Sequence, residues 1–307
     1  MAKLDTCYAI VDSASEPKLF SMLEKFNPPS CNLYSEPISP EVAELAPYLI
    51  EVTDEVQKWL SEQKTPWGIY VYTKITMREL RQHLRKYLMV MIPEQEKPVF
   101  WRFYDPRNIW FVLNILDNWK LHVFLGPINK IGTELLGRYK ESDFKSQRSY
   151  YPDNIKKHGK LMSFTKDEYE KINLNFECLF IKKMQFLFLK IRYSQENSIS
   201  DFDLSKCIVT IFETPILDFD KIENYYSKKY IDDAFCFSEG LVLFCKNIGI
   251  SDQYSYMLLC YILGFYRIYD FENLPINWIN QLNHPEGTCD YRIIKLCMNI
   301  LDEMPVF

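Results

Sequence analysis

The first 130 residues alternate between short strand-like runs and helix signals, and this alternation limits the possible folds more than any other feature. Residues 7–11 and 67–72 are apolar or aromatic runs of the kind that forms strands. The segment from Thr76 to Glu79 is a capping box, in which the threonine caps a backbone N–H and the glutamate reaches back. Apolar residues then recur at helical spacing as far as Met91. Strands that alternate with helices predict an α/β domain.

The rest of the chain divides by pattern. Residues 99–103 and 121–125 are predicted as strands on either side of a helix at 107–116. Glycines, prolines, basic residues and tyrosines then interrupt the pattern, and the helical pattern resumes near residue 164. The fold class that we expect is an α/β N-terminal domain followed by a mostly α-helical C-terminal domain. The expected boundaries are 1–134 for the α/β domain, 135–163 for a linker or extended loop, and 164–307 for the helical domain.

Charge is distributed unevenly along the chain. The net charge is −5, which argues against a nucleic-acid partner. Residues 1–196 carry 28 Lys and Arg against 25 Asp and Glu, whereas residues 197–307 carry 8 against 16. An acidic C-terminal part is compatible with a second surface that meets a different partner, and ordinary solvated faces explain it equally well.

Cysteine usage and hydropathy indicate the compartment. The nine cysteines are odd in number, have no C-x-x-C spacing and lie in part within apolar runs, which is typical of reduced, buried cysteines. The first residues lack the apolar segment of a signal peptide. The longest apolar runs are far shorter than the ~20 residues that span a bilayer. We expect a cytoplasmic protein with no membrane partner.

Motifs that support enzymatic chemistry are missing from the sequence. The 9 glycines do not cluster, so the chain contains neither a phosphate-binding loop nor a dinucleotide fingerprint. The G-x-S-x-G motif is absent, and the 4 histidines have no paired-ligand spacing. We therefore expect no enzyme, no cofactor and no metal.

Two aspartates provide the strongest alternative to this expectation. Asp12 follows the first predicted strand and Asp105 follows the strand at 99–103, and carboxylates beyond strand ends can hold Mg²⁺. Such a pair would make the chain a metal-dependent phosphohydrolase. Simpler roles exist, with Asp12 capping a helix at 17–26 and Asp105 forming a turn that begins the next helix. We favour the simpler roles, because no phosphate loop accompanies the aspartates.

The segment at 100–107 is the most informative in the chain. Arg102 lies inside an aromatic run, where burial is costly unless a carboxylate pairs with the guanidinium. We therefore expect Arg102 to pair with Asp12 or Asp105. Tyr104 and Arg107 are candidates for contact with a partner protein.

A set of motifs in the first 130 residues resembles a known family. In order along the chain they are Tyr8-Ala9-Ile10-Val11-Asp12, Leu45-Ala46-Pro47-Tyr48-Leu49, Trp67-Gly68-Ile69, the helix at 80–88, Arg102-Phe103-Tyr104-Asp105-Pro106-Arg107 and Phe124-Leu125-Gly126-Pro127-Ile128. The region resembles the effector-adaptor family of the type VI secretion system, which is catalogued as a domain of unknown function. The resemblance covers about residues 7–130, continues more weakly in the C-terminal part, and does not include residues 135–200.

The resemblance implies a cytosolic bacterial chaperone without catalysis. Its partners would be a cognate toxic effector and the VgrG spike protein onto which the effector is loaded, and neither nucleic acid nor a membrane. Asp12, Arg102 and Asp105 would then belong to a structural family motif. We further expect residues 1–130 to perform the docking task common to the family, and the acidic helical part to select the cargo.

Overall fold

A six-stranded antiparallel sheet organises the N-terminal part of the chain, with strand order β2-β3-β1-β4-β7-β8. The strands are β1 (Thr6–Asp12), β2 (Ser30–Asn32), β3 (Pro47–Glu51), β4 (Gly68–Thr73), β7 (Ile128–Leu135) and β8 (Arg138–Ser142). The computed structural model describes residues 4–34, 37–135, 137–152, 161–197, 225–250, 252–271, 274–284 and 286–301. Within it, the chain divides into two compact units, Met1–Leu174 and Asn175–Phe307.

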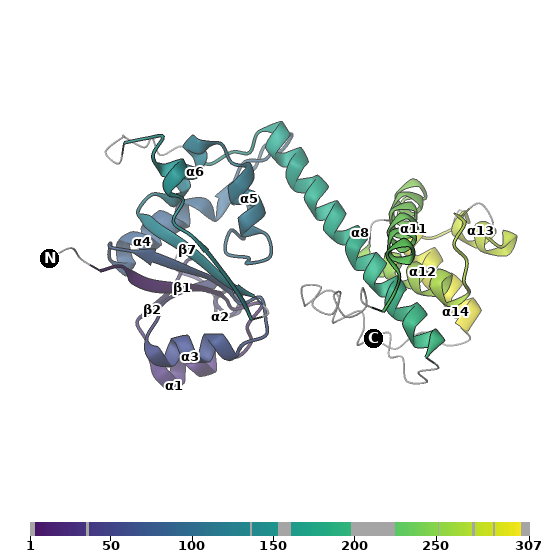
Figure 1. Cartoon of the computed structure of the whole chain (residues 1–307), viewed down its shortest axis with the longest axis horizontal. Helices are drawn as coiled ribbons and strands as arrows, with labels where there is room; N and C mark the ends of the chain where they lie inside the picture. The colour runs from purple at the N-terminus through teal and green to yellow at the C-terminus, as the bar shows by residue number, and fades with distance from the viewer. Residues whose placement is uncertain are drawn as a thin grey trace. The chain divides into compact units, whose positions relative to one another are not determined.

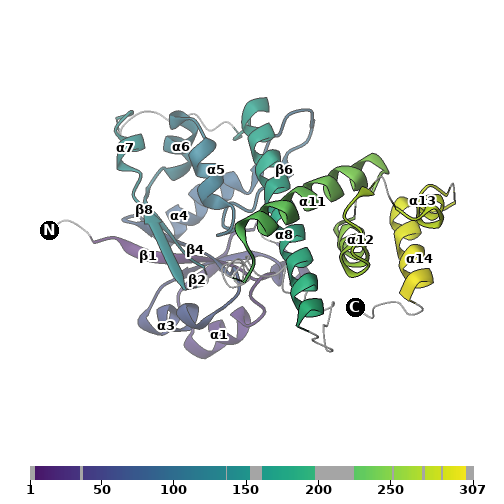
Figure 2. The same cartoon turned by 45° about the vertical axis from the view of Figure 1, so that its right-hand side comes forward.

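Helices cover both faces of the sheet (Figures 1 and 2). On one face lie α1 (Leu19–Phe26) and α3 (Asp54–Glu62), and on the other lie α4 (Met77–Leu84), α5 (Ile109–Ile115) and α6 (Asn118–Leu125). The shorter elements of this unit are α2 (Pro40–Ala43), η1 (Arg85–Tyr87), α7 (Lys145–Arg148) and a two-stranded sheet of β5 (Met89–Val90) and β6 (Val99–Phe100). The N-terminal unit therefore mixes strands and helices, as the sequence predicted.

The alternation of side chains along β1 explains why the sheet needs two layers of helices. Tyr8 and Ile10 point into the core beneath α4, α5 and α6, whereas Ala9 and Val11 point into the core beneath α1 and α3. All four are buried, because helices cover both faces of the sheet and β1 lies between β3 and β4. A strand that is apolar on both faces can lie only in the middle of such a sandwich.

Gly68 begins β4 at a point where two backbones approach very closely. Its φ of +151° belongs to the region that side chains rarely adopt, and an added Cβ would overlap the carbonyl oxygen of Ile10. The glycine of the Trp67-Gly68-Ile69 motif thus has a structural reason: it lets β4 pair with β1 in this register.

The structure corrects two expectations for the N-terminal unit. Residues 121–125, predicted as a strand, belong to helix α6, whose first turn is capped by the carboxylate of Asp117 accepting from the backbone N–H of Lys120 at 2.7 Å. Part of the expected linker, residues 138–142, is the edge strand β8, which pairs with β7 from Ile131↔Ser142 to Leu135↔Arg138. Residues 153–160 of that linker lie outside the described residues.

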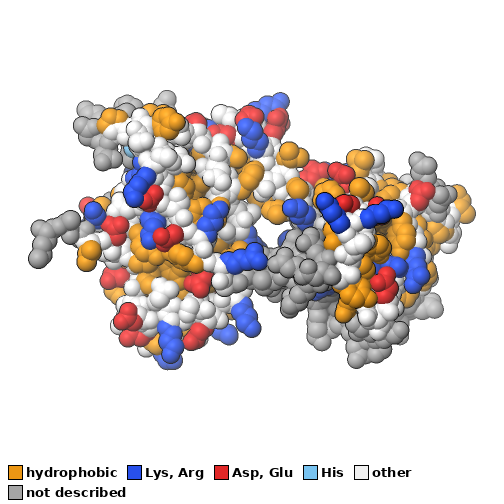
Figure 3. Space-filling model, in the orientation of Figure 1, with side chains coloured by type: hydrophobic (Ala, Val, Ile, Leu, Met, Phe, Trp, Pro, Cys, Tyr) orange, Lys and Arg blue, Asp and Glu red, His pale blue; other side chains and the backbone are white. Residues whose placement is uncertain are grey.

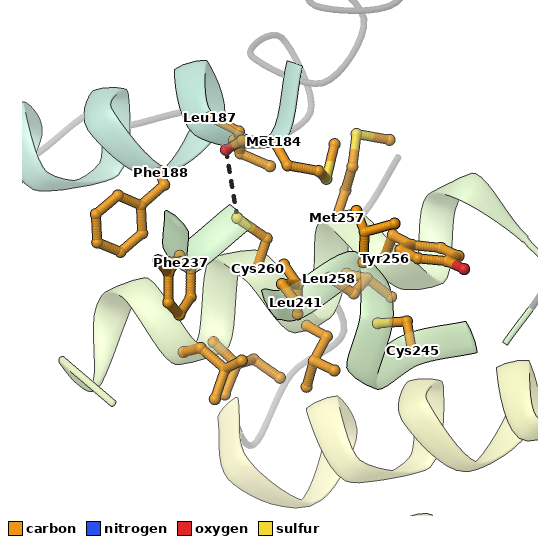
Figure 4. Close-up of a cluster of buried hydrophobic side chains, with 14 of the residues drawn as sticks. Met184, Leu187, Phe188, Phe237, Leu241, Cys245, Tyr256, Met257, Leu258 and Cys260 are labelled. Carbon is orange, nitrogen blue, oxygen red and sulfur yellow. Dashed lines mark hydrogen bonds between the residues drawn. The ribbon is translucent and has the colours of Figure 1, made fainter. Parts of the chain in front are cut away.

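The C-terminal unit is helical, as predicted. Its described elements are the later part of α8 (Lys166–Glu196), then α11 (Lys228–Asn247), α12 (Gln253–Phe265), α13 (Ile276–Leu282) and α14 (Cys289–Leu301). Its core is formed by apolar side chains from all five of these helices, with Met184, Leu241 and Leu258 fully buried (Figure 4). Cys260 lies among them, with its thiol 3.7 Å from the carbonyl oxygen of Met184.

Across the described ranges, no helix combines the length and the apolar character needed to cross a bilayer. The long helix α8 has 31 residues, with charged side chains between its apolar runs.

Candidate functional site

Asp12 and Arg102 form an ion pair that joins the end of β1 to the segment after β6. The guanidinium donates to Oδ2 of Asp12 and, at 3.1 Å, to the hydroxyl of Ser15. Asp12 has 4% of its side chain exposed and Arg102 has 43%. The expectation that Arg102 pairs with an acid is confirmed, with Asp12 as the partner, but only the carboxylate is buried.

The remaining contacts of Asp12 are local. Its carboxylate accepts from the backbone N–H of Ala14 at 3.3 Å and from the hydroxyl of Ser15 at 3.0 Å. Helix α1 begins at Leu19, and its N-cap is Lys18. Asp12 therefore stabilises the turn that leaves β1, and the expected role as cap of that helix is wrong, because six residues separate the carboxylate from the first helical residue.

Asp105 has a guanidinium partner of its own. Arg107 Nε donates to Oδ1 at 2.9 Å and Nη2 donates to Oδ2 at 2.7 Å, a bidentate arrangement. The same carboxylate accepts from the backbone N–H of Arg107 and from the side chain of Asn108. This fork holds the turn that precedes α5 at Ile109, as expected for Asp105, and raises the pKa of Arg107.

The two arginine–aspartate pairs limit the chemistry that Asp12 and Asp105 can perform. Each aspartate is neutralised by an arginine, and a guanidinium on a carboxylate competes with a metal cation for the same oxygens. No group of three or more His, Cys, Asp or Glu side chains suited to a metal occurs among residues that the structure describes. The aspartates therefore serve here as anchors for two turns.

The two residues expected to contact a partner differ in their exposure. Tyr104 is 1% exposed, and burial raises the pKa of its hydroxyl, so its ring belongs to the core. A surface contact through the Tyr104 ring is thus not available in this structure. Arg107 has 31% of its side chain exposed, so the outer side of its guanidinium can still meet a partner.

An open groove lies on the same unit, between the end of α4 and the small β5–β6 sheet. Its volume is about 540 Å³, and its lining residues are Tyr34, Gln82, Arg85, Lys86, Leu88, Met89 and Phe100. Met89 and Phe100 are paired across the two strands and are 39% and 43% exposed. Hydrophobic side chains also gather among charged ones on the face of this unit drawn in Figure 3.

The walls of the groove are held by specific contacts. Arg81, on α4, donates from Nε to the carbonyl oxygen of Asn32 at 2.7 Å and from Nη2 to that of Tyr34 at 3.0 Å. The Tyr34 ring then meets Phe100 edge to face, with centroids 5.7 Å apart. Because Phe100 lies two residues before Arg102, the ion pair with Asp12 restrains the chain that leaves this wall.

The groove is not apparent from the sequence. Its residues come from three separate segments of the chain, at 34, 82–89 and 100, and only the tertiary structure brings them together. One signal was present: the helix after the capping box carries basic residues on one side, among them Arg81, Arg85 and Lys86. Arg85 and Lys86 of that side line the groove, but nothing in their spacing indicated the apolar side chains beside them.

Comparison with known proteins places a domain on this unit. Residues 7–122 match the family model described as a domain of unknown function (DUF4123). The N-terminal unit therefore contains a DUF4123 domain, and that domain includes both arginine–aspartate pairs and all residues of the groove. No curated protein and no solved structure shows significant similarity to the chain.

Proposed function

We propose that this chain is a cytoplasmic bacterial adaptor, which binds a cognate effector of the type VI secretion system and promotes its loading onto the VgrG spike. One observation carries the proposal: the motif residues at 12 and 102–107 form two ion pairs that anchor two turns, in a unit whose surface also has an open groove with exposed apolar side chains. Residues that maintain a binding surface are what an adaptor requires of its family motif.

The division of the chain supports the same proposal. The DUF4123 match covers residues 7–122, whereas the acidic part of the sequence belongs to the helical unit. In the proposed adaptor, the N-terminal unit performs the task that family members share, and the helical unit selects one cargo. The boundary for a chimaera lies at residues 174–175, inside α8, because residues 175–196 pack with the C-terminal unit.

The test is affinity purification of the tagged chain from its own cells, followed by mass spectrometry. We expect a toxin-like protein or VgrG to be enriched over a tag-only control, and to co-purify again when the two proteins are expressed alone in a foreign host. Recovery of neither protein would contradict the proposal. Metal-stimulated hydrolysis of a phosphate ester by the pure protein, lost in Asp12→Asn and Asp105→Asn, would instead favour a metal-dependent phosphohydrolase.

A further inference from the structure

We draw no further inference here: the strongest candidate, the cluster of Tyr72, Lys130, Tyr139 and Glu141 on the sheet formed by β4, β7 and β8, has hydroxyl, ammonium and carboxylate groups that bond to one another, and nothing in the structure shows what covers it.

Discussion

Replacing Arg102 with alanine removes the only charged partner that the structure gives to the buried carboxylate of Asp12 among the described residues. The hydrogen bonds from Ala14 and Ser15 remain, but both donors are neutral. Arg102→Ala should therefore destabilise the N-terminal unit, because a carboxylate that is 4% exposed loses its counter-charge.

The exposure of Arg102 and Asp12 determines how much unfolding free energy the Arg102→Ala substitution should remove. Exposed ion pairs contribute about 0.2–1 kcal/mol, whereas removal of one partner from a fully buried pair costs about 3–5 kcal/mol. Here the carboxylate is buried and the guanidinium side chain is 43% exposed, so water screens one side of the pair. We expect a loss of about 2 kcal/mol in the free energy of unfolding, below the ~3 kcal/mol that a buried pair would imply.

Urea unfolding followed by tryptophan fluorescence measures this loss selectively. Five of the 6 tryptophans lie between residues 59 and 119, so the signal reports mainly on the N-terminal unit. A double-mutant cycle with Asp12→Asn should give a coupling energy of about 1 kcal/mol or more for the pair. The control is Arg78→Ala, an exposed arginine on α4, which should change stability by less than about 0.5 kcal/mol.

Either of two results would contradict the expected role of Arg102. A change within about 0.5 kcal/mol for Arg102→Ala would mean that the carboxylate tolerates the loss of its counter-charge. A coupling energy near zero would mean that Arg102 acts through packing of its aliphatic part rather than through Asp12.

Three further predictions concern the same unit. Millimolar Mg²⁺ or Mn²⁺ should leave the melting midpoint of the parent unchanged, because guanidinium groups already occupy Asp12 and Asp105; a rise that both Asp→Asn variants lose would reverse this conclusion. Gly68→Ala should abolish folding of the sheet, seen as loss of the cooperative fluorescence transition, since its Cβ would overlap the backbone of β1; a stable variant would show that β4 can shift. Burial raises the pKa of the Cys7 thiol to about 11, so about one thousandth of this thiol is thiolate at pH 8. Iodoacetamide should therefore label the exposed Cys178 far faster than Cys7 at that pH. Labelling of Cys7, followed by peptide mass spectrometry, should rise about tenfold per pH unit up to pH 10.

Local sequence signals predicted the structure correctly where the stabilising contact lies between residues close together in the chain. The capping box forms as predicted, with Thr76 accepting from the backbone N–H of Glu79 and the glutamate accepting from that of Thr76. The Arg102–Asp12 pair was accessible to reasoning as well, because an arginine in an aromatic run needs an acid and few acids were near a strand end.

Two elements were assigned wrongly for identifiable reasons. Residues 121–125 form a helix that is almost wholly buried, and a short apolar run gives no periodicity that separates a buried helix from a strand. Strand β8 is an edge strand, exposed along residues 138–141, so its charged sequence has the composition of a loop. The groove could not be predicted from the sequence, since Tyr34, Leu88 and Phe100 become neighbours only after the chain has folded.

The central position of β1 has a consequence during protein synthesis. β1 leaves the ribosome before both of the strands that flank it, and β4 begins about 55 residues after β1 ends. At about 5–20 residues per second, a nascent strand that is apolar on both faces waits on the order of 3–11 s for its second neighbour. Through that interval the edges of β1 are not fully paired and its two apolar faces are exposed, so the nascent chain is the state most prone to aggregate. Slower translation between residues 13 and 67 should therefore lower the yield of soluble protein more than slowing after residue 135.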